Sequence, residues 1–369
     1  MIIPFFIANR GCPHRCLFCN EALTAESRPD RLEEAVFRET VRAYLEAGRR
    51  KGGPVEIAFY GGTFTGMPAE EQRRLLGLAA FFLREGTIDH IRISTRPDEI
   101  DAEGLDLLWS SGVRTVEVGA QSLDDEVLRR SKRGHTAADT LHAVSLLKER
   151  RFATGIHLMT GLPGDSPERF ARTIDAVIAL SPDTVRIHPT IVLRDTPLAD
   201  AFRKGNYRPL TLAEAVVQCK EALKKLTAAG IPVIRMGLQT TRALEAPGAV
   251  VAGPFHPAFG TLVASAVFFD MAGALCESML AGGFTLIKSL TFTASPADVF
   301  HINGPRKANI AALKERFEPA DIRVTADPSL PRWTLILTAG SRGMKMDKSG
   351  QITGLHRKEV ADLTLRCLS

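Results

Sequence analysis

The chain has 369 residues, of which 45% are hydrophobic, and this is enough apolar sequence for a substantial core. At about 150 residues per domain the length predicts about two domains, and one barrel of about 200 to 250 residues with an appendage fits equally well. The 47 lysines and arginines against 42 aspartates and glutamates give a net charge of +5, which permits a polyanionic partner such as RNA without indicating one.

The sequence carries no sign of secretion or membrane insertion. Six cysteines over this length do not make a disulfide scaffold. The apolar start "MIIPFFIA" lacks the basic leader and small-residue cleavage site of a signal peptide. The longest apolar stretch, Leu262 to Cys276, contains Asp270 and is shorter than the roughly 18 residues that a membrane helix needs. We therefore expect a cytoplasmic protein in a reducing compartment, with no membrane partner.

Segments typical of strands and helices alternate over about the first 240 residues. The expected strands are 1–8, 54–62, 90–95, 113–119, 152–159, 184–192 and 231–237. The expected helices are 30–48, 68–84, 102–111, pieces of 123–150, 167–180 and 211–230. In the first helix, Leu32, Val36, Tyr44 and Leu45 have the spacing of an apolar face. In the last, Thr211 and Glu214 form a capping box.

This alternation predicts the fold class. Near-continuous apolar strands that are joined by helices imply parallel strands covered by helices. The sequence therefore predicts an α/β protein with a full or partial (β/α) barrel of about six parallel strands, similar to a TIM barrel. Functional residues of such a barrel are expected at the C-terminal ends of its strands.

After residue 244 the pattern changes. A helix from Leu262 to Leu280, a strand at 285–294, a helix within 306–317, and strands at 321–326 and 332–339 predict a small C-terminal α+β domain. We therefore expect two domains, residues 1–244 and 245–369. We expect the tail to close the open side of a partial barrel, because radical intermediates must be shielded from water. Burial of the tail would also avoid an exposed apolar patch of four phenylalanines, Phe255, Phe259, Phe268 and Phe269.

Three cysteines follow the first strand as C-x3-C-x2-C, at Cys12, Cys16 and Cys19. Iron–sulfur cubes are normally held by four cysteines, one for each iron, so three would leave one iron open. An open metal position is where chemistry takes place in catalytic zinc sites. A structural zinc site completed by His14, and a disulfide with one free thiol, are the alternatives. The isolated Cys219, Cys276 and Cys367 are interpreted as small buried apolar residues.

The cysteine motif, with "YGGTF" ending the second strand, resembles the radical S-adenosylmethionine superfamily. Within that superfamily, the radical domain of the Elongator catalytic subunit is similar in the order and spacing of five stretches over roughly residues 1–240. These stretches are "GCPHRCLFCN", "AFYGGTFTG", "IRISTRPD", "VEVGAQSLDDEVL" and "GLPGD". No R/Q-x-x-G-x-G follows Leu244, so the resemblance does not extend to that protein's acetyltransferase domain.

The resemblance implies a [4Fe–4S] cluster on Cys12, Cys16 and Cys19, with S-adenosylmethionine bound to the open iron. It also implies an electron donor of the ferredoxin or flavodoxin type, and it suggests tRNA as a substrate. The cofactor contacts that it implies are Phe18, Gly61, Gly62, Thr63, Ser94, Arg96, Glu117, Gln121 and Gly161.

Two of these contacts have a structural alternative. Gly61 and Gly62 would let the backbone approach the cofactor ammonium, or would simply form a tight turn after the strand. Glu117 lies inside an apolar strand, where a charge is costly without a partner. Its partner would be the cofactor ammonium, or else Arg96 or Arg114 in a structural ion pair.

Other polar residues do not identify a catalytic group. His157 and His188 lie in expected strands, where a lone histidine is more often a satisfied core residue, although in a barrel it can also line the cavity. Thr190 and Gln239 are equally ambiguous. The basic runs at 48–51, 129–133 and 148–151 are interpreted as solvated helix ends.

Two functions remain open at this stage. The first is a radical enzyme acting on tRNA or another nucleotide. The second is a non-catalytic scaffold that binds RNA or a partner. The intact cysteine triplet with Gly61 and Gly62 favours the enzyme, because a scaffold does not need an oxygen-labile cluster with an open iron.

Overall fold

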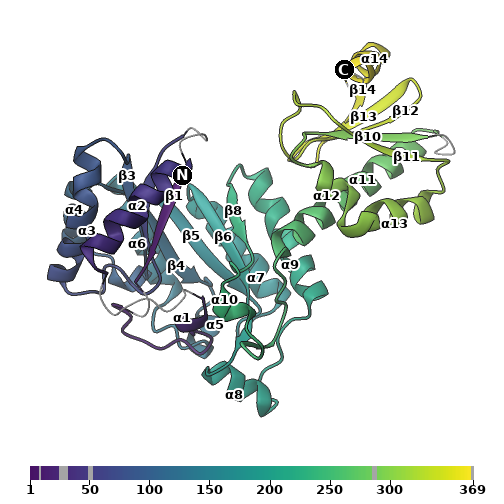
Figure 1. Cartoon of the computed structure of the whole chain (residues 1–369). Helices are drawn as coiled ribbons and strands as arrows, with labels where there is room; N and C mark the ends of the chain where they lie inside the picture. Colours follow the sequence, from purple (N-terminus) through teal and green to yellow (C-terminus); the bar gives the residue numbers. More distant parts are fainter. Residues whose placement is uncertain (8–9, 25–31, 49–52, 285–288, 367–369) are drawn as a thin grey trace. The chain divides into compact units, whose positions relative to one another are not determined.

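The structure is a computed structural model that describes residues 1–7, 10–24, 32–48, 53–284 and 289–366 (Figure 1). The chain forms two compact units. The first contains Met1–Ala215 and Ile231–Pro257, and the second contains Val216–Gly230 and Ala258–Ser369.

The first unit is built on a seven-stranded parallel sheet in the order β1-β2-β3-β4-β5-β6-β8. Its strands are β1 (Ile2–Phe6), β2 (Glu56–Tyr60), β3 (His90–Thr95), β4 (Val113–Gln121), β5 (Ala153–Thr160), β6 (Thr184–Pro189) and β8 (Val233–Met236). Because β1 and β8 form its edges, the sheet is a partial barrel, where a closed TIM barrel has eight strands. The predicted fold class is confirmed, with seven strands in place of about six.

The connections between the strands are helical, as the alternation predicts. The helices of this unit are α1 (Glu21–Thr24), α2 (Glu34–Gly48), α3 (Ala69–Arg84), α4 (Ala102–Ser110), α5 (Asp125–Arg130), α6 (Ala137–Glu149), α7 (Pro167–Leu180), α8 (Pro197–Arg203) and α10 (Arg242–Glu245). Helix α9 (Leu212–Ala228) begins in the first unit and continues into the second. It starts with the predicted capping box, in which Thr211 and Glu214 each accept a hydrogen bond from the other's backbone N–H.

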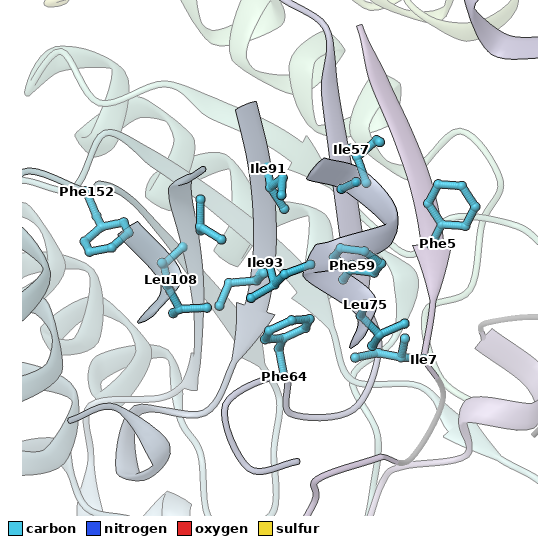
Figure 2. Packing of buried hydrophobic residues seen from close by; sticks show 14 of the residues in the cluster. Phe5, Ile7, Ile57, Phe59, Phe64, Leu75, Ile91, Ile93, Leu108 and Phe152 are labelled. Carbon is cyan, nitrogen blue, oxygen red and sulfur yellow. The ribbon is translucent and has the colours of Figure 1, made fainter. Parts of the chain in front are cut away.

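The outer face of the sheet forms the apolar core with the helices that cover it (Figure 2). Phe59, Ile57 and Ile93 from the strands are fully buried there. Phe5 of β1 stacks on Phe37 of α2, with ring centroids 4.3 Å apart. This cluster is the main stabilising core of the first unit.

The predicted apolar face of the first helix is partly wrong. Phe37 and Val41 are the buried residues of α2, whereas Val36 and Tyr44 are 48% and 39% exposed. Phe37 and Val41 lie one turn apart and form the stripe that meets the sheet. The sequence of α2 contains two possible apolar stripes, and the stripe that contains Phe37 is the one that packs into the core.

The inner face of the same strands is polar, which the expectation of near-continuous apolar strands missed. Alternate residues point to opposite faces of a strand, so Arg92 lies between the buried Ile91 and Ile93. Arg186 is placed in the same way between Val185 and Ile187. The inner face therefore lines a space that is not filled by apolar side chains.

A small ladder follows the sixth strand. The expected strand at 184–192 is divided into β6, which ends at Pro189, and β7 (Val192–Leu193). Strand β7 pairs antiparallel with β9 (Val250–Ala252) outside the main sheet. Proline has no N–H to donate to a ladder, which is consistent with the end of β6 at that residue.

The second unit has a five-stranded sheet in the order β11-β10-β12-β13-β14. Its strands are β10 (Leu290–Ala294), β11 (Ile322–Ala326), β12 (Leu335–Ala339), β13 (Arg342–Met346) and β14 (Ile352–Leu355), and its helices are α11 (Phe259–Ala281), α12 (Val299–Asn303), α13 (Ala308–Phe317) and α14 (Arg357–Arg366). The predicted α+β composition is confirmed. Residues 285–288 of the expected strand 285–294 lie outside the described residues.

Helix α11 is the core helix of the second unit. By length and composition alone it could cross a membrane, but 61% of its most apolar window is buried in the structure, so this is weak evidence of a membrane span. Phe259 and Phe268 are buried, and Phe268 stacks on Trp333 of the same unit with centroids 5.6 Å apart. Phe255 and Phe269 are half-buried. That the tail closes the barrel stays a prediction, as does a domain boundary after residue 244.

Candidate active site

A cavity of about 1440 Å³ opens on the inner face of the seven-stranded sheet. The cysteine loop, the Gly61–Gly62 turn and the C-terminal ends of β3 and β4 contribute to its wall. Cys12, Cys16 and Cys19 all line it. The cysteine loop therefore lies at the end of the barrel where the sequence predicts functional residues.

The cysteine loop is fixed by contacts to its surroundings. Leu17 donates its N–H to the carbonyl of Ser131 (3.2 Å), and its own carbonyl accepts from the N–H of Leu198 (3.0 Å). The Cys12 thiol lies 3.2 Å from the Thr63 hydroxyl, and Arg133 donates Nη1–H to the Cys16 sulfur at 3.1 Å. These contacts hold the three sulfur atoms beside the cavity.

The Cys12 and Cys19 thiols are protonated at neutral pH. Burial raises the pKa of Cys12, and burial together with the nearby Glu21 carboxylate raises the pKa of Cys19 to about 12. The charge of Cys16 contributes in the same direction to the pKa of both. A metal that binds here must displace these protons, so loading of the site releases protons.

Among the described residues, no group of three His, Cys, Asp or Glu side chains converges closely enough to hold a single metal ion. A zinc site needs such convergence, because all its ligands bind one ion. A [4Fe–4S] cube does not, because each thiolate binds a different iron. Three thiols are the donor set that a [4Fe–4S] cluster with one open iron would use.

The glycine pair is required by close backbone packing. Gly61 and Gly62 have φ angles of 77° and 64°, in the left-handed region that favours glycine. A Cβ at Gly62 would lie 2.4 Å from the Arg10 carbonyl oxygen. The Gly62 N–H donates to Oε1 of Glu21 at 2.7 Å, so the turn also binds the start of α1. The tight-turn interpretation therefore holds, and a side chain at Gly62 would displace the cysteine loop whether or not a ligand is bound.

Arg96 and Ser94 end the third strand beside the cavity. Arg96 is 3% exposed and makes a two-point ion pair with Asp98, with contacts of 2.9 and 2.7 Å. It also donates to the carbonyl of Arg133, while its Nη1 is buried without a partner. Arg96 is thus fixed in place with one donor left over.

Gln121 ends the fourth strand in a strained conformation. Its φ angle is 67°, which is uncommon for a residue other than glycine, and the register between β4 and β5 shifts just before it. The residue is buried, and its Oε1 has no partner. Such strain is often found at functional sites.

Of the three remaining residues predicted to contact the cofactor, two line the cavity and one does not. Phe18 and Thr63 line the cavity. Gly161 is not among the described residues that line it. Its φ angle is 76°, its N–H donates to Asp165 at 2.9 Å, and its carbonyl accepts from the Tyr207 hydroxyl at 2.6 Å. The structure gives Gly161 a role in the turn after β5.

Glu117 has three structural partners, and none of them is one that the sequence suggested. Its Oε1 accepts from Arg92 (2.9 Å), from Arg186 (3.0 Å) and from the Tyr60 hydroxyl (3.1 Å). Arg96 is paired with Asp98, and Arg114 packs over the Trp109 ring. The structural alternative, an ion pair with Arg96 or Arg114, is wrong because both arginines are engaged elsewhere.

His157 and His188 are not satisfied core residues. Both line the cavity with ring centroids 4.4 Å apart, and the Nε2 of each is buried without a partner. Burial lowers the pKa of His157 to about 3, and it also lowers the pKa of His188. Both are therefore neutral at pH 7. Gln239 also lines the cavity, whereas Thr190 is buried and bonded to the Thr160 carbonyl.

Sequence reasoning missed several residues of the site. Arg133 belongs to the run 129–133, which was interpreted as a solvated helix end, yet it is 6% exposed and contacts Cys16. Arg129 and Arg130 of that run are exposed, as expected. Arg92 and Arg186 could have been found from a single charge between two apolar residues in a strand, the signal that drew attention to Glu117.

The residues present fit a cofactor with polar groups. Buried atoms without a hydrogen-bond partner include Arg96 Nη1, Arg133 Nε and Gln121 Oε1, and all three residues line the cavity. Leaving such atoms unpaired is costly, so they indicate a polar ligand. The three thiols beside them are suitable ligands for iron.

A partial barrel with a three-cysteine loop at the C-terminal ends of its strands defines a cofactor-dependent barrel enzyme. Two family models match, the Radical SAM superfamily over residues 6–177 and the Radical_SAM C-terminal domain over residues 182–267. The chain belongs to the radical S-adenosylmethionine superfamily. A [4Fe–4S] cluster and S-adenosylmethionine are the cofactors of this superfamily of enzymes, and the residues of the cavity fit both.

The curated relatives include Elongator-like proteins, and also a coproporphyrinogen III oxidase and a heme chaperone. The chain is 30% identical to the tRNA uridine(34) acetyltransferase of Methanocaldococcus jannaschii over 58% of its own length and 47% of that protein. It is 28% identical to Elongator complex protein 3 of Mus musculus over 44% of its length and 34% of that protein. The chain thus spans about half or less of the length of these relatives.

A solved structure supports the fold. The archaeal Elp3 of Methanocaldococcus infernus, with an N-terminal deletion, matches with a TM-score of 0.56 at 22% identity, over 76% of this chain and 63% of that chain. At this identity the similarity concerns the fold alone.

Proposed function

We propose that this protein is a radical enzyme that reductively cleaves S-adenosylmethionine and uses the resulting radical to modify tRNA or another nucleotide. The observation that carries the proposal is the cysteine triplet beside a cavity that is lined by buried, unpaired polar atoms. A scaffold that only binds a partner would have no use for either feature.

When bound, the reduced cluster supplies one electron that breaks the C5′–S bond of S-adenosylmethionine, which gives methionine and a carbon-centred radical able to abstract hydrogen. Cys12, Cys16 and Cys19 would hold three irons and leave the fourth open. Arg133, at 3.1 Å from the Cys16 sulfur, stabilises the thiolate form of that ligand by a charge-assisted hydrogen bond.

The cavity wall would orient the cofactor and exclude water. Arg96 is fixed by Asp98, so its free Nη1 is a preorganised donor. Gln121 is held by the distorted end of β4, and its free Oε1 is an acceptor. Tyr60, Glu117 and Arg186 form a bonded group on the inner face, so the wall is rigid before any ligand binds.

The nucleotide substrate is proposed from the relatives, whose names specify tRNA uridine 34 and the Elongator complex. An electron donor of the ferredoxin or flavodoxin type would reduce the cluster. The nucleotide substrate and the electron donor would both place the protein in the cytoplasm.

The test is anaerobic reconstitution with iron and sulfide. We expect about four irons per chain and release of 5′-deoxyadenosine when dithionite and S-adenosylmethionine are added. Replacing Cys12, Cys16 or Cys19 with Ala should abolish both, whereas Cys219→Ala, a buried cysteine outside the motif, should leave both unchanged. A triple cysteine variant that still binds four irons would disprove the assignment.

The substrate is tested separately by mass spectrometry of small RNAs from cells with and without the protein. A modified nucleoside that disappears with the gene, and returns with the wild type but not with Cys16→Ala, would support RNA modification. Its return with Cys16→Ala would instead support the RNA-binding scaffold.

A further inference from the structure

The inner face of the sheet carries charged side chains deeper than the cysteine loop. Arg92 donates to Glu56 (2.8 Å) and to Glu117 (2.9 Å), and Arg186 also donates to Glu117 (3.0 Å). The Glu117 carboxylate is therefore shared by two cations, and the Glu56 carboxylate is bonded to Arg92. Both carboxylates therefore already have a guanidinium partner.

Arg235 of β8 is the additional cation. It lines the cavity and lies opposite Arg186 in the strand register. Within the described parts of the chain it makes no hydrogen bond or ion pair. Burial and the charge of Arg186 lower its pKa, although a guanidinium remains charged at pH 7. Arg235 is exposed on the cavity wall, with the charge of Arg186 beside it. The Glu117 charge opposes this repulsion, but that carboxylate is already bonded to Arg92 and Arg186, so Arg235 remains available to an added anion.

Neutral donors surround this position. His157 is opposite Arg186 in the register and His188 follows two residues later on β6, so both project onto the same face. The Nε2 of each imidazole and the Nε of Arg186 are buried without a partner. Unpaired buried donors beside an unpaired cation point to an acceptor that carries negative charge.

We propose that the part of the cavity between β5, β6 and β8 is a binding site for an anionic group of the substrate, a carboxylate or a phosphate. Arg235 and Arg186 neutralise its charge, and His157 and His188 donate hydrogen bonds to it. The inference rests on the proposed function, because it takes the cavity as the place where the substrate binds. The cysteine loop, Arg96 and Gln121 belong to the cofactor end of the same cavity.

The test compares ligands that differ in charge. Binding of uridine 5′-monophosphate against uridine measures the phosphate arm, and binding of orotate against uracil measures the carboxylate arm, by calorimetry on the anaerobically reconstituted protein. In the wild type we expect the anion of at least one pair to bind about tenfold more tightly, which is the usual size of a charge-assisted hydrogen bond.

Arg235→Gln should remove most of this preference, and Arg235→Lys should retain part of it. Because Arg235 has no hydrogen-bond or ion-pair partner among the described residues, its replacement should not unfold the protein. Melting should show that the anion preferred in calorimetry, uridine 5′-monophosphate or orotate, raises the Tm of the wild type but not that of Arg235→Gln. Arg129→Gln, which removes a cation that is 71% exposed and does not line the cavity, is the matched control and should leave all of these values unchanged.

Three results would overturn the site: no preference for the anion in the wild type, an equal loss of charged and neutral ligands in Arg235→Gln, or a matching loss of affinity for S-adenosylmethionine in that variant. The last would assign the position to the cofactor carboxylate. If the charge preference is found but no 5′-deoxyadenosine is released, the anion site stands and the proposed function fails.

Discussion

The two faces of the seven-stranded sheet are made by the same strands but have opposite chemistry. The outer face is apolar and fully buried, with Phe59 and Ile93 packed under the helices. The inner face carries Arg92, Glu117 and Arg186 in a bonded group around a cavity. Since neighbouring residues of one strand serve both faces, stability and function are separated by a single residue position.

This separation explains how the inner face can remain incompletely satisfied. Burial of apolar area contributes about 25 cal/mol per Å², so the outer face can outweigh unpaired donors on the inner one. The unpaired atoms of His157, His188 and Arg186 are all on the inner side. Substitutions on the two faces should therefore change the free energy of unfolding by different amounts and for different physical reasons.

Phe59→Ala should have the largest effect on stability. The Phe59 ring is fully buried and lies 5.5 Å from Phe64 and 6.2 Å from Phe5, so its removal leaves a cavity in the core. We expect the free energy of unfolding to fall by about 3–5 kcal/mol. Urea unfolding measures this, with Leu141→Ala, an exposed leucine, as the control. A loss below about 1 kcal/mol would mean that the outer face is not the main core.

Glu117→Gln should have an intermediate effect, through charge. The substitution keeps the size of the side chain but leaves Arg92 and Arg186 around a neutral amide. We expect a loss of about 2–3 kcal/mol, the scale of hydrogen bonds to a charged group. Glu126→Gln, whose partners Arg129 and Arg130 are exposed, should cost much less, because solvent screens a surface ion pair. Equal losses in the two variants would show that the inner network does not stabilise the empty protein.

How much the sequence could predict follows the same division. The outer face is governed by the alternation of apolar strands and helices, and this pattern was sufficient for the parallel partial barrel. The cysteine triplet and Gly61–Gly62 could be found because they are local motifs. The sequence alone could not show that Phe37 is buried and Val36 is exposed. Helix α2 has two apolar stripes, and which of them is buried depends on how the helix packs against the sheet.

The inner face depends on strand register, which a single sequence does not specify. Glu117 was singled out, but its partners Arg92 and Arg186 lie 25 and 69 residues away in the chain. Arg133 meets Cys16 over 117 residues, and only the return of the chain after α5 brings them together. The strands β13 and β14 were missed because charged residues and glycines conceal their pattern.

The smallest expected effect is a pH dependence to which the buried histidines of the inner face contribute. In the folded protein burial lowers the pKa of His157 from 6.5 to about 3, so the unfolded chain binds more protons between these two values. Stability therefore rises with pH through this window, is complete above pH 6.5, and decreases as the pH falls below it. One such group contributes about 1 kcal/mol between pH 6.5 and pH 5.5.

We expect His157→Gln, which cannot be protonated, to lose less stability than the wild type over this interval. His142→Gln, which removes an exposed histidine of α6, should leave the wild-type slope unchanged. His188 has the same environment and retains part of the slope in the His157 variant, so the difference is small. Urea unfolding at several pH values measures it, and parallel curves for wild type and His157→Gln would show that His157 is solvated and not part of the buried inner face.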